Sequence, residues 1–406
     1  MIKKIAVSDL QVGMFVHEFG GAWLDHPFWK SRFKVQHSAD LNKIRESGIG
    51  EVFIDTERGS DVPSRPAERP PLAAQVCAAV DRPPRVALDV EVSRALKICG
   101  RAKDAVISMF NDARMGQAIN AQDTALLIGE ISASVERHPQ ALISLSRLKT
   151  SDEYTYMHSV AVCALMVALA RQLDMPDEWV REAGVAGLLH DIGKMTIDID
   201  ILNKPGRLTD DEYGIVKGHP EGGLRILQQS KLNSATAIDV CLHHHEKYDG
   251  SGYPFGLAGE QISVFARMAA ICDVYDAITS ERPYKKAWGP AHSIREMATW
   301  AGHFDEKIFQ AFVRAVGIYP IGALVRLHSE RIGLVVEQND RHLLKPKVML
   351  LVSARTRMPL ERKVLDLASF TAEDRIIRIE SVKDWDLHNL DEIWSGLPAP
   401  VQGSRF

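Results

Sequence analysis

The sequence predicts a mainly helical protein, with a helical bundle between a small N-terminal α/β domain and a short C-terminal β subdomain. Three observations support this fold class. Apolar side chains recur at helical spacing through most of residues 89–320. Short β-like runs occur near both ends of the chain. The 406 residues, 46% of them hydrophobic, are sufficient for more than one domain with a buried core.

The N-terminal part is expected to be a small folded domain followed by a linker. Residues 1–60 should form the α/β domain, with strands at Met14–Val16 and Glu51–Asp55. A short helix is expected over 38–48, because a serine cap begins it and a glycine ends it. Residues 61–88 should be the linker, since closely spaced prolines interrupt both helix and strand.

The rest of the chain divides into three further parts. Residues 89–139 should form two connecting helices, at 89–115 and 121–136, which pack as a hairpin or serve as a dimerisation stalk. Residues 140–320 should form the main bundle. Residues 321–406 contain four short β-like runs, which predict the C-terminal β subdomain.

The helices of the main bundle are expected to carry polar metal donors. The run Val160–Ala170 is apolar on nearly every face, so its helix should be central. The expected positions are His158 in this central helix, which opens with a capping box of Thr150 and Glu153; His190 and Asp191 in the last turn of a helix from Pro176 to Gly193; His219 at the N-cap before Pro220; His244 and His245 at the end of a helix from Ser234; and Asp273 within a helix over Val264–Ser280.

Charge and composition limit the partners. The formal net charge is −4, so no bulk positive field would attract DNA, RNA or an anionic membrane. A phosphate-bearing substrate would therefore need local cations. The first residues show no secretory signal, and the longest apolar run is shorter than the roughly 20 residues that cross a bilayer. The five widely spaced cysteines are interpreted as reduced thiols, so we expect a cytoplasmic protein without membrane insertion.

The donor set itself predicts metal binding. Five imidazoles, if buried without partners, would cost several kcal/mol, and coordination removes that cost. Imidazole and carboxylate without thiolate favour iron or manganese, with nickel, magnesium and zinc as alternatives. Seven donors exceed the needs of one open site, so we predict two divalent ions that share Asp191. Two neighbouring ions are a common arrangement for hydrolysing a phosphodiester.

The same motifs resemble those of the HD-GYP domain, a branch of the HD phosphohydrolase superfamily. The matching segments are HDIGK at 190–194, HPE at 219–221, HHEKYDGSGYP at 244–254 and DVYDAITSERPYK at 273–285. The resemblance covers about residues 140–320, and residues 1–60 resemble a small domain often found ahead of such domains. It implies an HD-type helical bundle that hydrolyses the bacterial messenger cyclic di-GMP to pGpG, and in a second round to GMP.

The resemblance also implies roles for individual residues. The metal ligands would be His158, His190, Asp191, His219, His244, His245 and Asp273. Asp191 and Lys194 would be catalytic, with Lys194 stabilising charge on the scissile phosphate. The other substrate contacts would be Gly252, Tyr253, Arg282 and Lys285, the last two holding phosphates. Tyr154 stands where some relatives have a glutamate that supports a third metal, which again predicts two ions.

Several alternatives remain open at the level of sequence. The protein could be a cyclic di-GMP receptor that signals to a partner protein through its N-terminal domain or its GYP surface. It could instead hydrolyse a hybrid cyclic GMP-AMP. Lys194 could simply stabilise a helix C-terminus, and the Gly-Ser-Gly-Tyr-Pro segment could be only a turn. The helices within 89–136 also leave a homodimer open.

Overall fold

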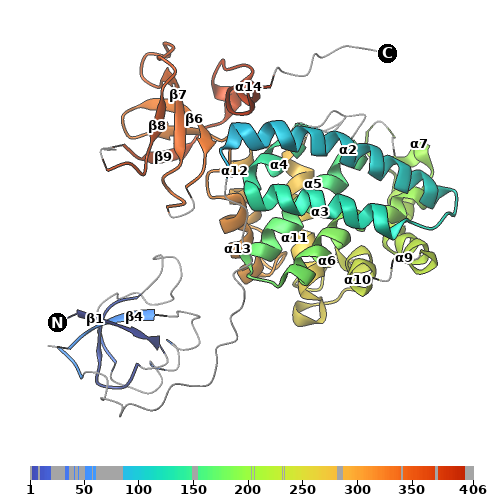
Figure 1. Cartoon of the computed structure of the whole chain (residues 1–406), viewed down its shortest axis with the longest axis horizontal. Coiled ribbons are helices and arrows are strands. Elements are labelled where there is room, and N and C mark those ends of the chain that lie inside the picture. The colour runs from blue at the N-terminus through green and yellow to red at the C-terminus, as the bar shows by residue number, and fades with distance from the viewer. Residues whose placement is uncertain are drawn as a thin grey trace. The chain divides into compact units, whose positions relative to one another are not determined.

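The computed structural model divides the chain into two compact units, Met1–Val80 and Asp81–Phe406, and each is described by itself (Figure 1). The structure describes residues 2–7, 10–19, 33–35, 41, 44, 51–56, 58–60, 86–148, 154–202, 204, 206–230, 232, 234–280, 287–339, 342–370 and 374–397. No helix among these residues is both long and apolar enough to cross a membrane.

The first unit contains an antiparallel sheet with the strand order β1-β4-β2-β3. Its strands are β1 (Ile2–Ala6), β2 (Phe15–Phe19), β3 (Phe33–Lys34) and β4 (Glu51–Asp55). Val16, Val52 and Ile54 are fully buried within the core of this unit. Strands predicted near 14–16 and 51–55 are therefore confirmed as β2 and β4. Apart from residues 41 and 44, the helix expected over 38–48 lies outside the described residues.

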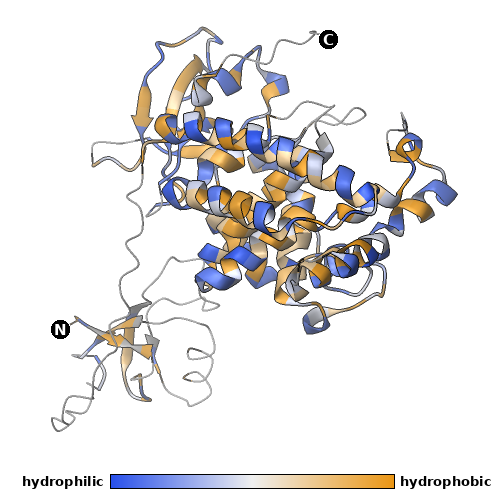
Figure 2. Ribbon diagram, turned by 45° about the vertical axis from the view of Figure 1, so that its right-hand side comes forward, coloured by the Kyte–Doolittle hydropathy of each residue, from blue (hydrophilic) through white to orange (hydrophobic). Residues whose placement is uncertain are grey.

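The second unit is built around one central helix. Its helical elements are α2 (Leu88–Arg114), α3 (Ala121–Arg137), α4 (Pro139–Ser146), α5 (Tyr154–Gln172), α6 (Asp177–Leu189), η4 (Ile192–Thr196), α7 (Ile199–Leu202), α8 (Asp210–Lys217), α9 (His219–Gln229), α10 (Ala235–His243), η5 (Gly259–Gln261), α11 (Val264–Thr279), α12 (Pro290–Met297) and α13 (Glu306–Val316). Residues Val160–Ala170 of α5 are all buried, against α2, α3, α4, α6, α11 and α13 (Figure 1). Hydrophobic residues, coloured orange in Figure 2, gather in the middle of this bundle, whereas its surface helices carry both hydrophobic and hydrophilic residues. The predicted central position of this helix is confirmed.

A five-stranded antiparallel sheet belongs to the same unit, with the strand order β8-β7-β6-β5-β9. The strands are β5 (Leu324–Leu327), β6 (Arg331–Glu337), β7 (Lys347–Ser353), β8 (Val364–Asp366) and β9 (Ile376–Ile379), and α14 (Leu390–Ser395) packs on β6. Alternate residues serve two cores: Val325 and Val335 pack within the sheet's own cluster, whereas Leu324 and Leu334 join the core of the bundle. The mainly helical fold class with a small C-terminal sheet is confirmed.

Three helix boundaries beside the donor residues differ from the sequence prediction. Helix α10 ends at His243, so His244 is its C-cap and His245 follows the helix. Helix α6 ends at Leu189 rather than Gly193, and the chain continues as the tighter helix η4. Helix α9 begins at His219 itself, so Gly218 is the N-cap. The differences in α6 and α9 lie where η4 packs closely against α9, since a Cβ atom on Gly193 would lie 1.8 Å from the carbonyl oxygen of His219. The capping box expected at Thr150 and Glu153 lies outside the described residues.

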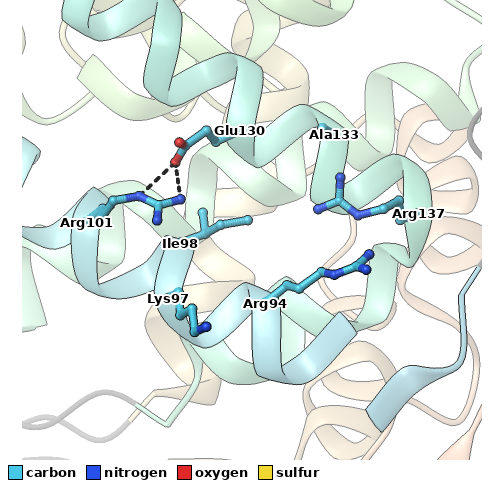
Figure 3. Close-up of a pocket in the computed structure, with 7 residues that line it drawn as sticks. All are labelled: Arg94, Lys97, Ile98, Arg101, Glu130, Ala133 and Arg137. Carbon is cyan, nitrogen blue, oxygen red and sulfur yellow. Dashed lines mark hydrogen bonds and ion pairs between the residues drawn. The ribbon is translucent and has the colours of Figure 1, made fainter. Parts of the chain in front are cut away.

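Helices α2 and α3 are joined by ion pairs of two kinds. Figure 3 shows the pocket of about 290 Å³ between them, where Arg101 and Glu130 form an exposed pair at 2.9 Å. Glu91 is fully buried and accepts hydrogen bonds from Arg137 at 2.8 Å and from Ser134 at 2.8 Å. The predicted helices 89–115 and 121–136 are thus confirmed as a packed hairpin.

The buried pair predicts a pH-dependent stability. Burial alone would raise the pKa of Glu91, but the hydrogen bonds from Arg137 and Ser134 outweigh it and hold this pKa below its usual value of 4.5. A lowered pKa in the folded state stabilises the fold above the unfolded value, and this stabilisation is lost as the pH falls through the folded pKa. We expect Glu91→Ala to lower the free energy of unfolding by about 3 kcal/mol at pH 7. The matched change Glu130→Ala in the exposed pair should cost less than about 1 kcal/mol.

Chemical denaturation of both variants at several pH values checks this prediction. The loss of unfolding free energy in Glu91→Ala, relative to wild type, should become smaller below pH 4.5. The loss in Glu130→Ala should stay small at every pH. Equal losses in the two variants at pH 7 would contradict it.

Candidate metal centre

Seven donor side chains converge on the interior of the bundle from different elements. They are His158 on α5, His190 at the end of α6, Asp191 before η4, His219 at the start of α9, His244 and His245 just after α10, and Asp273 on α11. Their donor atoms form two groups, one of Asp191, His219, His244 and His245 and one of His158, His190 and Asp273, within 4.8 Å in each group. The structure therefore brings together every donor that the sequence pointed to.

Asp191 lies between the two groups. Its Oδ2 atom is 3.2 Å from His190 Nε2 and 3.5 Å from His158 Nε2. Its Oδ1 atom is 3.3 Å from His219 Nε2 and 3.7 Å from His244 Nε2. Each carboxylate oxygen thus faces a different group of imidazoles, as a bridging ligand would.

The tautomers of the histidines are set by their backbone contacts. The Nδ1 atom of His190 lies 2.8 Å from the carbonyl oxygen of Gly187, and that of His219 lies 2.7 Å from the carbonyl oxygen of Val216. The Nδ1 atom of His244 makes the same kind of contact at 3.0 Å with a backbone carbonyl oxygen of α10, four residues before it. Because a carbonyl oxygen only accepts, Nδ1 carries the proton in each ring. The Nε2 lone pairs are therefore directed at the donor groups, the arrangement that metal-ligating histidines need.

Two features of this geometry fit a bound cation. The Nε2 atoms of His219 and His244 lie only 3.4 Å apart, although both carry lone pairs when the rings are neutral. Among the residues that the structure describes, none forms a hydrogen bond with the buried Oδ1 atom of Asp191. A buried carboxylate oxygen and two facing lone pairs are costly unless a positive charge lies among them. The donor set therefore fits divalent metal.

Burial and the neighbouring carboxylates set the charge of the cluster. Burial lowers the pKa of His219 to about 3, so its ring is neutral and can coordinate metal. Burial would also lower the pKa of His158, but hydrogen bonds to three carboxylates, including Asp191 and Asp273, raise it to about 10, so this ring would have to lose a proton to coordinate a metal. Burial opposes ionisation of Asp191, yet the nearby Lys194 ammonium helps to hold its pKa well below the usual range. The carboxylates thus remain ionised and attract a cation.

Lys194 lies at the edge of the cluster. Its ammonium group contacts Asp191 Oδ2, and about a quarter of the side chain is exposed. The preceding residue, Gly193, allows η4 to press against α9, because a Cβ atom there would lie 1.8 Å from the carbonyl oxygen of His219. This close approach brings Asp191 and His219 together.

The GYP loop, formed by Gly252, Tyr253 and Pro254, lies against His245 at one side of the cluster. The ring of Tyr253 stacks on that of His245, with centroids 4.7 Å apart and an interplanar angle of 26°. Gly252 has no room for a side chain, since a Cβ atom would lie 2.3 Å from the backbone nitrogen of Lys247. Both predicted loop residues therefore lie beside the donors. Arg282 and Lys285 lie outside the described residues, as does the side chain of Tyr154.

Glu246 supports this loop and was not singled out from the sequence. It is 2% exposed and accepts hydrogen bonds from the backbone amides of Phe255 at 2.8 Å and Leu257 at 3.1 Å. Its position directly after the His244–His245 pair could have indicated that Glu246 supports the site. His243, the first of the three consecutive histidines, belongs to neither donor group, and its ring pairs with Asp239 at 2.9 Å.

Asp276 is a second residue that the sequence reasoning missed. It is 1% exposed, and its Oδ2 atom lies 2.6 Å from His158 Nδ1. Its position three residues after Asp273 on α11 places both carboxylates on one helix face, which could have revealed it. The contact orients the imidazole of His158 toward the other donors, as a carboxylate behind a metal-ligating histidine does.

We therefore expect Asp276→Ala to weaken metal binding by about 10- to 100-fold. Competition between the protein and a chromophoric chelator measures this affinity without reference to turnover. Asp239→Ala is the matched control, because Asp239 pairs with His243 outside both donor groups. Equal metal affinity in Asp276→Ala and wild type would rule out the orienting role.

A helical bundle with a buried histidine–aspartate pair at the centre of a divalent metal site defines an HD domain. The family model described as "HD domain" matches residues 131–308, and a domain of unknown function, DUF3391, matches residues 2–124. The chain carries an HD domain and belongs to the same family as the full-length relative described next.

Three relatives illustrate the range of this family. The chain is 58% identical over 408 residues to cyclic di-GMP phosphodiesterase PA4108 of Pseudomonas aeruginosa, covering 100% of this chain and 98% of that protein. It is 39% identical over 180 residues to the cyclic di-GMP phosphodiesterase response regulator RpfG of Xanthomonas campestris, covering 42% and 47% of the two chains. It is 32% identical over 176 residues to 3′3′-cGAMP-specific phosphodiesterase 1 of Vibrio cholerae, covering 43% and 41%.

Proposed function

We propose that this protein is a metal-dependent phosphodiesterase that hydrolyses cyclic di-GMP to pGpG, and in a second round to GMP. The observation that carries this is the position of Asp191, whose two oxygens face two separate groups of imidazoles. A relative that is similar along its whole length is a cyclic di-GMP phosphodiesterase, which supports the same substrate.

Two divalent ions would be held by the two donor groups, with Asp191 shared between them. Iron or manganese suits the imidazole and carboxylate donors best, and nickel, magnesium and zinc are the alternatives. Such ions supply Lewis-acid polarisation of phosphoryl oxygens and acidify water.

Residues around the cluster would bind the substrate and stabilise charge. The Lys194 ammonium would donate to a non-bridging phosphate oxygen as negative charge develops during in-line displacement of the 3′ oxygen. Gly252 and Tyr253 would line the nucleotide pocket beside His245. Arg282 and Lys285 would hold the phosphates, a role that rests on the motif alone.

Removal of the metal tests the proposal directly. We expect protein purified without air to contain about two ions per chain, because two ions sharing Asp191 account for all seven donors. Chelation should abolish the conversion of cyclic di-GMP to pGpG, and iron(II) or manganese(II) should restore it. Element analysis and a chromatographic product assay give the two readouts. Full turnover by protein without stoichiometric metal would overturn the proposal.

A hybrid cyclic GMP-AMP is the second candidate substrate, because one relative is specific for 3′3′-cGAMP. Turnover of the cyclic dinucleotides under identical conditions ranks them. A pure receptor is the remaining alternative, and it would bind cyclic di-GMP tightly without forming product.

We further propose a cytoplasmic enzyme, since the four cysteines within the described residues are free and buried. Our proposed domains are an N-terminal regulatory domain at 1–60, a linker at 61–88, connecting helices at 89–139, a catalytic domain at 140–320 and a C-terminal region at 321–406. A homodimer, and a signalling partner bound by the N-terminal domain or the GYP surface, belong to the same proposal. Size-exclusion chromatography with light scattering tests the dimer.

A further inference from the structure

Helix α8 lies on the surface, and contacts hold it in place at both ends. None of its residues is buried. Thr209 and Glu212 form a capping box at its start, and Lys204 pairs with Glu212 at 2.6 Å. At its other end, the carbonyl oxygen of Val216 holds the ring of His219 at 2.7 Å. A helix that contributes nothing to the core, yet adjoins a donor histidine, is positioned to present side chains at the site.

Those side chains form a continuous surface with the GYP loop. The Lys217 ammonium lies 4.9 Å from the ring centroid of Tyr213 and 5.1 Å from that of Tyr253. Tyr213 is 49% exposed, and Lys217 is also exposed. Tyr253 in turn stacks on His245, so the surface leads directly from the donor cluster to α8. Within the described part of the chain, Lys217 makes no ion pair.

We propose that Lys217, held between Tyr213 and Tyr253, recognises a guanine base of the substrate. This inference rests on the proposed function and assigns the residue that selects the base. Aromatic rings beside a phosphodiester site suit the stacking of a flat nucleobase. An ammonium group only donates hydrogen bonds, so it matches the O6 and N7 acceptors of guanine. Adenine presents an amino donor in place of O6, which repels the ammonium group.

The proposal predicts which dinucleotides are accepted. Cyclic di-GMP carries two guanines, and hybrid cyclic GMP-AMP can place its single guanine at Lys217. Cyclic di-AMP has no guanine, so it should be the poorest substrate. Lys217→Met should raise KM for cyclic di-GMP about 10-fold with little change in kcat, as expected for loss of one base contact. The preference for cyclic di-GMP over cyclic di-AMP should fall by a similar factor.

Three further variants separate base recognition from a structural effect. Lys217→Arg keeps the charge and the donors, and it should restore most of the preference. Tyr213→Ala removes stacking, so it should raise KM for both dinucleotides equally. Ile215→Ala is the matched control, because Ile215 is an exposed residue of α8 two positions from Tyr213 and so on another face of the helix. Its kinetics should equal those of wild type, and metal content should be unchanged in all variants.

The outcomes distinguish this inference from the proposed function. If metal-loaded wild type hydrolyses no cyclic dinucleotide, the proposed function fails. If wild type prefers cyclic di-GMP and Lys217→Met keeps both its KM and its preference, base recognition by Lys217 fails. An equal rise in KM for both dinucleotides in Lys217→Met would also overturn it, because the contact would then not read the base.

Discussion

We expect replacement of both His190 and Asp191 by alanine to abolish metal binding and the proposed turnover of cyclic di-GMP. Asp191 contributes an oxygen to each side of the cluster, and His190 belongs to the second donor group, so both groups lose a member. Loss of a residue that merely supports a metal ligand costs about 10- to 100-fold in affinity or activity. We therefore expect the double variant to retain less than about one hundredth of wild-type kcat. Element analysis and the product assay measure both effects.

His243→Ala is the control for this experiment. His243 immediately precedes the donor His244, but its ring pairs with Asp239 and belongs to neither donor group. This variant should keep its metal and its turnover. If the double variant hydrolysed cyclic di-GMP as fast as wild type, the mechanism would be wrong, whatever the control showed.

We expect replacement of Lys194 by methionine to lower kcat about 10²- to 10³-fold, the range typical for the loss of one donor that stabilises transition-state charge. The Lys194 ammonium reaches the donor cluster from its exposed edge, where a phosphate oxygen could accept its hydrogen bond. Metal content should remain near that of wild type, because Lys194 belongs to neither donor group. Single-turnover kinetics with saturating metal isolates this effect on chemistry.

Lys204→Met is the control for Lys194→Met, because it also removes one positive charge. Lys204 pairs with Glu212 away from the donor cluster, so its removal should leave kcat unchanged. If Lys194→Met lost metal and activity in parallel, Lys194 would be assigned to the support of Asp191 rather than to the substrate.

Most of the metal centre could be predicted from sequence, because its residue types and motifs are local. His190 and Asp191 are adjacent, His244 and His245 are adjacent, and Pro220 marks the helix start that presents His219. The exact helix ends could not be predicted in the same way. Helix α6 stops at Leu189 because the following residues pack against α9, a contact between segments that sequence spacing does not encode.

Supporting residues were harder to find. Asp276 shares a helix face with Asp273, but its contact is with His158, which is 118 positions away in the chain. Glu246 accepts hydrogen bonds from backbone amides that lie nine and eleven residues after it in the chain. Neither partner can be identified from periodicity, because the pairing depends on how the chain folds back.

The local sequence was sufficient to predict which residues are candidate donors, that their imidazole and carboxylate groups suit iron or manganese better than a thiolate zinc site, and which helices carry them. The division of these donors between two groups, the opposite directions of the Asp191 oxygens and the place of Lys217 beside Tyr253 required the folded chain. The physical reason is distance along the sequence: helical spacing governs neighbours within a few residues, whereas these contacts join helices whose mutual packing is set by the whole core.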